Sequence, residues 1–207
     1  MLKEIALLLA LAALCNGCGC GCGCGGGGQC SDGKKGGNDF SKINIQANKD
    51  GLCKVGLKTH YIPDGAITAS SYWRPDVDDF HAPKWARLDQ AFIPNVSVGS
   101  WSAATNNANQ WIEVALGKAT TITGVITQGR DSLDQWVTEF KVSYLAADLT
   151  WKTVNDNSGT AILFSGNSDR NSPVTNMFYL PITAHKLRIL PTKWRGHISL
   201  RHEYLTC

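Results

Sequence analysis

The sequence predicts an all-β protein, organised as a secreted β-sandwich that follows a cysteine- and glycine-rich N-terminal arm. Cys53 and Cys207 bracket a long segment that contains no other cysteine. Within this segment, short runs of alternating apolar residues are separated by Gly, Asn, Asp and Ser turns. The six remaining cysteines all lie upstream of Cys53. We therefore expect a folded module and a separate cysteine-bearing arm.

Size and charge narrow the class of protein. A chain of 207 residues is long enough for one domain with a full core and too short for two ordinary ones. The formal net charge is +3, and no run of basic residues exceeds the pair Lys34-Lys35. This mild balance argues against a nucleic-acid-binding protein. No stretch of 18 apolar residues occurs, so we expect no membrane-spanning helix.

Residues 1–17 have the pattern of a secretory signal peptide. Lys3 precedes an apolar run from Ile5 to Leu14, and small residues follow it. Cleavage after Cys15 or after Gly17 fits this pattern. We therefore expect a secreted, extracellular protein whose cysteines form disulfides in an oxidising compartment.

Residues 18–52 are predicted to form a disordered arm and linker, because their Gly/Cys-rich and polar composition cannot bury a core. Cleavage of the signal peptide leaves an odd number of arm cysteines, namely Cys18, Cys20, Cys22, Cys24 and Cys30. An odd number favours disulfides between chains, and hence a disulfide-linked homo-oligomer. Zn or Cu(I) binding by the thiolates and local disulfides are the alternatives.

The segment after Cys53 shows the two-residue period of β-strands. Ile112, Val114 and Leu116 share one face of a predicted strand. Further strands are expected at residues 120–127, 136–144 and 186–190, with turns at 117–118, 155–157 and 166–167. Repeated short strands with turns between them predict a sandwich or jelly roll.

Several ordered blocks carry a family resemblance. They include NQWIEVALG at residues 109–117, TQGRDSLDQWVTEFKVSY at 127–144, GNSDRNSPVTN at 166–176 and ILPTKWRGHISLRHEYLTC at 189–207. On these blocks, residues 53–207 resemble the discoidin domain, also called the F5/8 type C domain. The resemblance implies an eight-stranded jelly-roll sandwich with the galactose-binding-domain-like fold, whose terminal cysteines, Cys53 and Cys207, are bridged.

The resemblance also implies a non-enzymatic binding module that contacts its ligand through loops, called spikes, at one end of the sandwich. The spikes map to residues 72–84, 94–101 and 128–135. The candidate ligand-binding residues on or beside them are Trp73, Asp76, Asp78, Asp79, Phe80, Trp101, Arg130 and Leu133.

Each of these residue types has a second interpretation. Trp73 and Phe80 lie in a loop rich in Pro and Asp, where ligand contact and local packing are equally good explanations. The arginines, including Arg130, could bind anions, but nearby acidic residues such as Asp134 and Glu203 favour internal ion pairs. The acidic residues of the first spike could hold Ca²⁺, although a solvated acidic loop explains them better.

No cofactor is required by the sequence, and no catalytic motif is present: H-E-x-x-H, G-x-S-x-G and the P-loop are all missing. We therefore expect an adhesion protein that recognises a cell-surface glycan or receptor. The alternatives are a peripheral binder of anionic phospholipid, and a structural matrix protein crosslinked through its arm.

The sequon at Asn95, within a predicted loop, predicts N-glycosylation.

Overall fold

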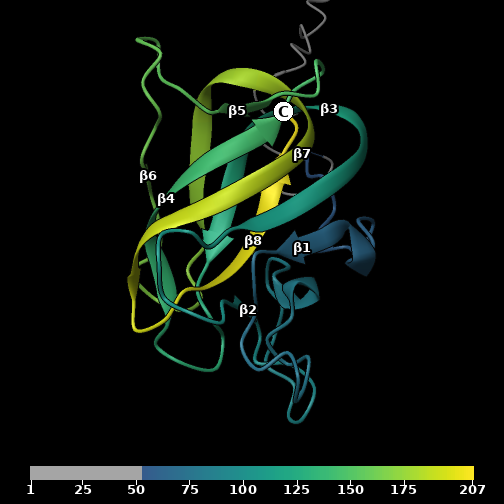
Figure 1. Ribbon diagram of the computed structural model, residues 1–207, viewed down its shortest axis with the longest axis vertical. Helices are drawn as coiled ribbons and strands as arrows, with labels where there is room; N and C mark the ends of the chain where they lie inside the picture. The colour runs from purple at the N-terminus through teal and green to yellow at the C-terminus, as the bar shows by residue number, and fades with distance from the viewer. Residues whose placement is uncertain (1–52) are drawn as a thin grey trace, which may run out of the picture. The chain divides into compact units, whose positions relative to one another are not determined.

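The computed structural model describes residues 53–207, and this part of the chain is almost entirely β. Its strands are β1 (Ile67–Ala69), β2 (Trp101–Ser102), β3 (Ile112–Gln128), β4 (Trp136–Leu145), β5 (Trp151–Thr153), β6 (Phe164–Ser165), β7 (Val174–Arg195) and β8 (Ser199–Leu205) (Figure 1). Two short 3-10 helices, η1 (Asp64–Ala66) and η2 (Pro83–Trp85), precede β2. The predicted eight-stranded all-β fold is confirmed.

The predicted signal peptide, the arm and its five cysteines lie outside the described residues. Within residues 53–207, no helix has the length and apolar character needed to cross a membrane.

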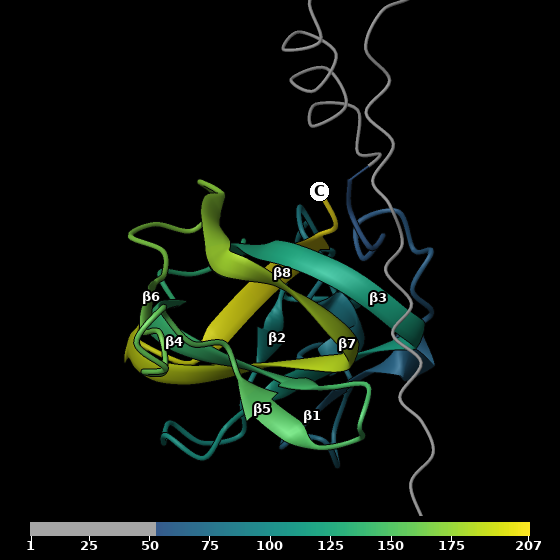
Figure 2. The same ribbon diagram turned by 90° about the horizontal axis from the view of Figure 1, so that it is seen from above.

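Two long strands, β3 and β7, contribute to both layers of the sandwich. The first part of β3 pairs with β1 and with the last part of β7, whereas its second part pairs with the first part of β7 and with β8. Strand β4 pairs with β7, β5 and β6, and β2 pairs with β8. Every one of these pairs is antiparallel, and the strands surround the interior in Figure 2.

The bend of β3 corrects one sequence-based expectation. Residues 112–116 and 120–127 were expected to be separate strands joined by a turn at Gly117-Lys118. The structure instead runs β3 through this point, with a register shift between Ala115 and Thr120. Gly117 has φ 74°, a left-handed conformation that glycine adopts without steric cost. The extra residues bulge and bend the strand without reversing the chain.

The core lies between the layers and is built from inward-facing residues of alternate positions. Phe140 and Val142 of β4 are fully buried, as is Trp101 of β2. Strand β8 is buried along its whole length, including the charged Glu203. The Glu203 carboxylate accepts the backbone N–H groups of Leu57 at 3.1 Å and Lys58 at 3.0 Å, which compensates for its burial.

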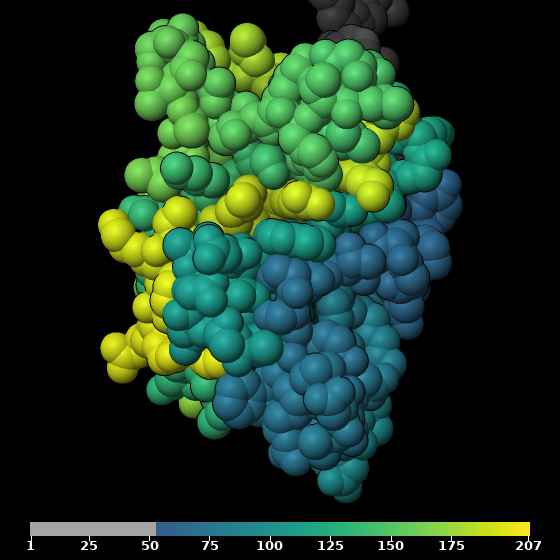
Figure 3. Space-filling model, in the orientation of Figure 1, coloured from purple at the N-terminus to yellow at the C-terminus, as the bar shows by residue number. Residues whose placement is uncertain are grey.

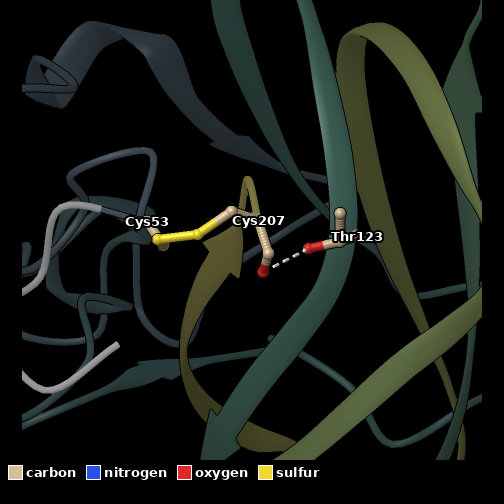
Figure 4. Close-up of a disulfide and its surroundings, with 3 residues drawn as sticks. All are labelled: Cys53, Thr123 and Cys207. Carbon is tan, nitrogen blue, oxygen red and sulfur yellow. Dashed lines mark hydrogen bonds between the residues drawn. A yellow bond between two sulfur atoms is a disulfide. The ribbon is translucent and has the colours of Figure 1, made fainter. Parts of the chain in front are cut away.

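A disulfide joins Cys53 to Cys207, with the two Cα atoms 5.3 Å apart, as the family resemblance implies (Figure 4). The last residue is also held by its carbonyl, which accepts a hydrogen bond from Thr123 Oγ1 at 3.0 Å. The bridge spans a sequence separation of 154 residues. In the chain-entropy model, closing so long a loop stabilises the folded state by about 5 kcal/mol at most.

Replacing both cysteines, Cys53→Ser and Cys207→Ser, is expected to lower the free energy of unfolding by roughly 3–5 kcal/mol, because the unfolded chain regains its freedom. Chemical denaturation of the wild type and the double variant measures this loss. Non-reducing peptide mapping supplies the direct check. Recovery of either cysteine paired with an arm cysteine would contradict the assignment.

Candidate ligand-binding site

The three predicted spikes lie together at one end of the sandwich and are joined by hydrogen bonds. Phe80 O in the first spike accepts the N–H of Val98 in the second at 3.1 Å. Ser132 Oγ in the third spike donates to Val98 O at 2.9 Å, and Asp131 N–H donates to Gly99 O at 3.3 Å. The first two spikes fall in the blue to teal region of Figure 3. These bonds make the spike end one connected surface.

A hollow of about 340 Å³ opens at this end. It is lined by Trp73, His81, Ser102, Arg130, Gln135 and His197. Its volume lies in the range of small-molecule pockets. Among the described residues that line it there is no carboxylate, so its polar groups are a guanidinium, two imidazoles, an amide and a hydroxyl.

Trp73 forms the aromatic wall of the hollow. Its backbone N–H donates to Ser102 O at 2.9 Å, which anchors the first spike on β2. Its ring meets the ring of His197 edge to face, with centroids 5.5 Å apart. The side chain remains 43% exposed. The indole is therefore held in place and still open to a ligand.

Arg130 carries the positive charge of the hollow. Its Nε donates to Ser132 Oγ and its Nη1 donates to Gln135 Oε1, both at 2.8 Å. Within residues 53–207, no carboxylate lies within ion-pair distance of this guanidinium. Partial burial lowers the pKa of Arg130, and no acidic neighbour offsets the loss of hydration. The internal ion pair favoured by the sequence is therefore wrong for this arginine.

His81 is neutral at pH 7. Burial, together with the nearby charge of Arg130, lowers its pKa from 6.5 to about 4. Its Nδ1 is buried and has no hydrogen-bond partner among the described residues. A proton on Nδ1 would therefore find no acceptor among them. The other imidazole, His197, is oriented by its Nε2, which lies 2.7 Å from Ala103 O.

Several exposed apolar side chains lie on or next to the spikes. They are Trp73, Val77, Phe92, Ile93, Val96 and Leu133. They come from, or directly adjoin, all three spikes. Exposed apolar side chains gathered on connected loops are typical of an interaction surface.

The structure places Trp101 differently from the sequence-based prediction. Trp101 belongs to β2 and is 0% exposed, with its Nε1 donating to Ser71 O at 2.8 Å. It therefore packs in the core and cannot contact a ligand. Phe80 is half-buried and does not line the hollow. Trp73 and Arg130 line the hollow, and Leu133 is exposed on the third spike outside it. Contact of these three residues with a ligand stays a prediction.

The acidic residues of the first spike do not gather into a metal site. Asp79 pairs with Lys84, and Asp78 Oδ1 accepts the N–H of Phe80 at 3.1 Å. Asp76 lies exposed in the same loop. No group of three or more His, Cys, Asp or Glu residues with metal-binding geometry occurs within residues 53–207. The predicted option of Ca²⁺ at Asp76, Asp78 and Asp79 is therefore not supported by their arrangement.

Three other arginines are internal clamps. Arg87 pairs with Asp64, and Arg188 Nε donates to Glu113 Oε2 at 2.7 Å. The third, Arg201, donates to backbone carbonyls and an amide, and does not pair with Glu203.

Sequence reasoning missed four residues of the hollow, namely His81, Ser102, Gln135 and His197. They lie in the first spike, in β2, in the third spike and in the turn between β7 and β8. Isolated His and Gln residues carry no local spacing signal. The boundaries of the spikes alone could have pointed to His81 and Gln135, since both fall within the predicted loops.

Comparisons with known proteins agree with this architecture. The F5/8 type C domain family matches residues 66–204. Lactadherin from Rattus norvegicus is 37% identical over 158 residues, which covers 74% of this chain and 36% of lactadherin. Retinoschisin from Mus musculus is 36% identical over 109 residues, which covers 52% of this chain and 49% of retinoschisin. The chain thus spans only about a third to a half of these relatives.

Solved structures show the same fold. Discoidin II from Dictyostelium discoideum has a TM-score of 0.60 and 30% identity, and the match covers 68% of this chain and 54% of that one. A CBM32 module from Clostridium perfringens, solved with GalNAc-β-1,3-galactose, has a TM-score of 0.50 and 16% identity, over 70% of this chain and 99% of the module. At that identity the likeness concerns the fold alone.

The fold and the loop-built hollow define a β-sandwich binding module. The chain belongs to the F5/8 type C (discoidin) domain family.

Gly99→Ala is expected to disturb the contact between the second and third spikes. Gly99 has φ 72°, and an added Cβ would lie 2.6 Å from the Cβ of Asp131 and 2.8 Å from the backbone N of Phe92. Strain and clash together should cost roughly 2–4 kcal/mol in the free energy of unfolding. Chemical denaturation measures the loss.

Gly159→Ala is the matched control, because Gly159 has φ 84° but nothing within 4 Å of an added Cβ. It should show only the backbone strain, roughly 1 kcal/mol. Equal losses in the two variants would show that the contact between the spikes is not tight.

Proposed function

We propose that this protein is a secreted, non-enzymatic binding and adhesion protein that recognises a cell-surface or matrix ligand, a glycan or a protein, through its spike end. The observation that carries the proposal is the hollow with the half-exposed Trp73 as one wall and polar side chains as the others. Small-ligand sites typically combine an apolar or aromatic wall with a few placed polar groups. An indole face also suits the apolar face of a sugar ring.

A second candidate function rests on the apolar side chains of the spikes. Phe92, Ile93 and Val96 lie around the second spike, and Leu133 lies on the third. Such side chains suit insertion into the interface of a membrane that carries anionic phospholipids. Capture by vesicles that contain phosphatidylserine, and not by phosphatidylcholine vesicles, would favour this alternative.

N-glycosylation at Asn95 forms part of the proposal. Asn95 is exposed and has φ 58°, within the turn in which Ile93 and Ser97 are bridged. The side-chain amide of Asn95 is therefore accessible to the enzyme that would attach the glycan. A glycan there would cover part of the second spike and leave recognition to the first and third, whose residues form most of the hollow.

We also propose that the arm crosslinks copies of the protein. With five arm cysteines, at least one thiol has no partner within its own arm. Covalent linkage of several modules raises the effective concentration of the second site to about the millimolar range, which strengthens attachment to a surface.

Trp73→Ala is expected to reduce ligand capture on a glycan array at least roughly tenfold, because the aromatic wall is lost. Its melting temperature should stay within a few degrees of the wild type, since a half-exposed loop side chain contributes about 1 kcal/mol or less. Trp151→Ala is the matched control, because Trp151 is 41% exposed but lies on β5 and does not line the hollow. Equal capture by the two variants would count against the proposed site.

Non-reducing electrophoresis of the secreted protein is expected to show a ladder of covalent oligomers that collapses to monomer with a reductant. Deleting residues 18–30 should abolish the ladder and weaken surface attachment, while the module keeps its melting temperature. A native protein that is wholly monomeric would overturn the crosslinking role of the arm.

A further inference from the structure

We propose that the hollow at the spike end selects a carboxylated sugar, such as a hexuronic acid, and that the guanidinium of Arg130 binds the carboxylate. This inference rests on the proposed function, because it names the ligand class of the same hollow. It follows from the charge, the free donors and the shape of the lining.

No carboxylate among residues 53–207 pairs with the guanidinium of Arg130. The two acidic residues closest to it in sequence are engaged elsewhere: Asp131 Oδ2 accepts the N–H of Phe92 at 2.8 Å, and Asp134 pairs with Arg170. A partly buried cation is destabilised unless an anion or enough hydrogen bonds replace its water. An anionic ligand supplies the missing charge.

The guanidinium is held in position and still has free donors. Of its five N–H donors, one on Nε and one on Nη1 bond to Ser132 and Gln135. Nη2 makes no hydrogen bond to any residue from 53 to 207. The donors that remain on Nη1 and Nη2 form the planar fork that binds a carboxylate through two parallel bonds.

The rest of the lining favours a sugar over a bare anion. A hollow of about 340 Å³ is much larger than a single carboxylate or phosphate group. Trp73 offers an apolar aromatic face, whereas Gln135 offers the N–H donors of its side-chain amide. A hexuronic acid presents an apolar ring face, hydroxyl groups and one carboxylate. These three features match the three kinds of group in the lining.

His81 makes the selection dependent on pH. The groups that act on its charge are Arg130 on the third spike, Asp78 and Arg74 on the first, and His197 in the turn between β7 and β8. Burial and Arg130 keep His81 neutral at pH 7. A carboxylate bound beside it favours the protonated form and raises its pKa, so affinity must increase as the pH falls from 7 to 5.

The test compares galacturonic acid with galactose, which differ in the carboxylate at one carbon. Saturation-transfer NMR titrations of the full secreted chain measure both dissociation constants. We expect galacturonic acid to bind at least roughly tenfold more tightly at pH 6, the equivalent of about 1.4 kcal/mol. Arg130→Gln should abolish the difference and Arg130→Lys should restore part of it. Lys118→Gln removes the same charge from a residue that does not line the hollow and should change nothing.

The pH series supplies a readout that a structural role for Arg130 would not produce. We expect the bound carboxylate to raise the pKa of His81 from about 4 to its ordinary value near 6.5. Galacturonic acid should then bind roughly 20-fold more tightly at pH 5 than at pH 7, because His81 takes up a proton on binding at the lower pH. His81→Asn should flatten this dependence, and galactose should show little of it. Melting temperatures of the variants confirm that each is folded.

Several results would overturn the inference. Equal affinity for the two sugars, a folded Arg130→Gln variant that keeps the preference, or weaker galacturonic acid binding at pH 5 would each do so. Galactose binding that depends on Trp73 but not on Arg130 would overturn the carboxylate selection while leaving the proposed function intact. Capture by phosphatidylserine vesicles with no binding of either sugar would overturn both the carboxylate selection and the glycan form of the proposed function.

Discussion

The spike end depends on one buried cation, Arg201, which ties together segments that are far apart in sequence. Its Nε donates to Gly129 O at 2.7 Å and its Nη1 to Gln90 O at 2.9 Å. Its Nη2 donates to both Arg170 O and Asn171 Oδ1 at 2.7 Å. A buried guanidinium is tolerated only while its donors are bonded. Because Arg201 lies on β8, which is paired with β2 and β3, the base of the third spike is fixed by the strands and not by the loop alone.

Some arginines of this protein are bonded to other parts of the fold, whereas Arg130 keeps donors free for a ligand. Arg201 and Arg87 are buried, and Nη1 and Nη2 of both reach carbonyl or carboxylate oxygens of the protein. Arg188 lies between the rings of Trp111 and Trp151 and bonds to Glu113. Arg130 differs because its Nη2 makes no hydrogen bond to any residue from 53 to 207, and its other donors reach only Ser132 and Gln135. The fold thus leaves one positioned cation for a ligand, beside an aromatic wall.

The strands could largely be predicted, because a two-residue alternation reports directly which face of a strand is buried. Strand β4 was expected at residues 136–144 and runs from Trp136 to Leu145. The continuity of β3 was not predicted, since a glycine that permits a bulge has the same local signal as one in a turn. The core position of Trp101 was not predicted either, because a two-residue strand has no alternation that can be seen in the sequence. Trp101 belongs to β2 only through the pairing of β2 with β8.

The family and most of the strand content could be identified from the residues alone, because they depend on ordered sequence blocks and on periodicity. The partition between the module and the arm stays a prediction. The sequence also placed Trp73 and Arg130 on loops at one end. The three-dimensional arrangement was needed to show that Arg130 has no carboxylate partner among residues 53–207, while Asp134 pairs with Arg170. It also brought His81, Gln135 and His197 to one hollow. The physical reason is that charge compensation and pocket lining depend on distances between segments remote in sequence, which residue spacing along the chain does not encode.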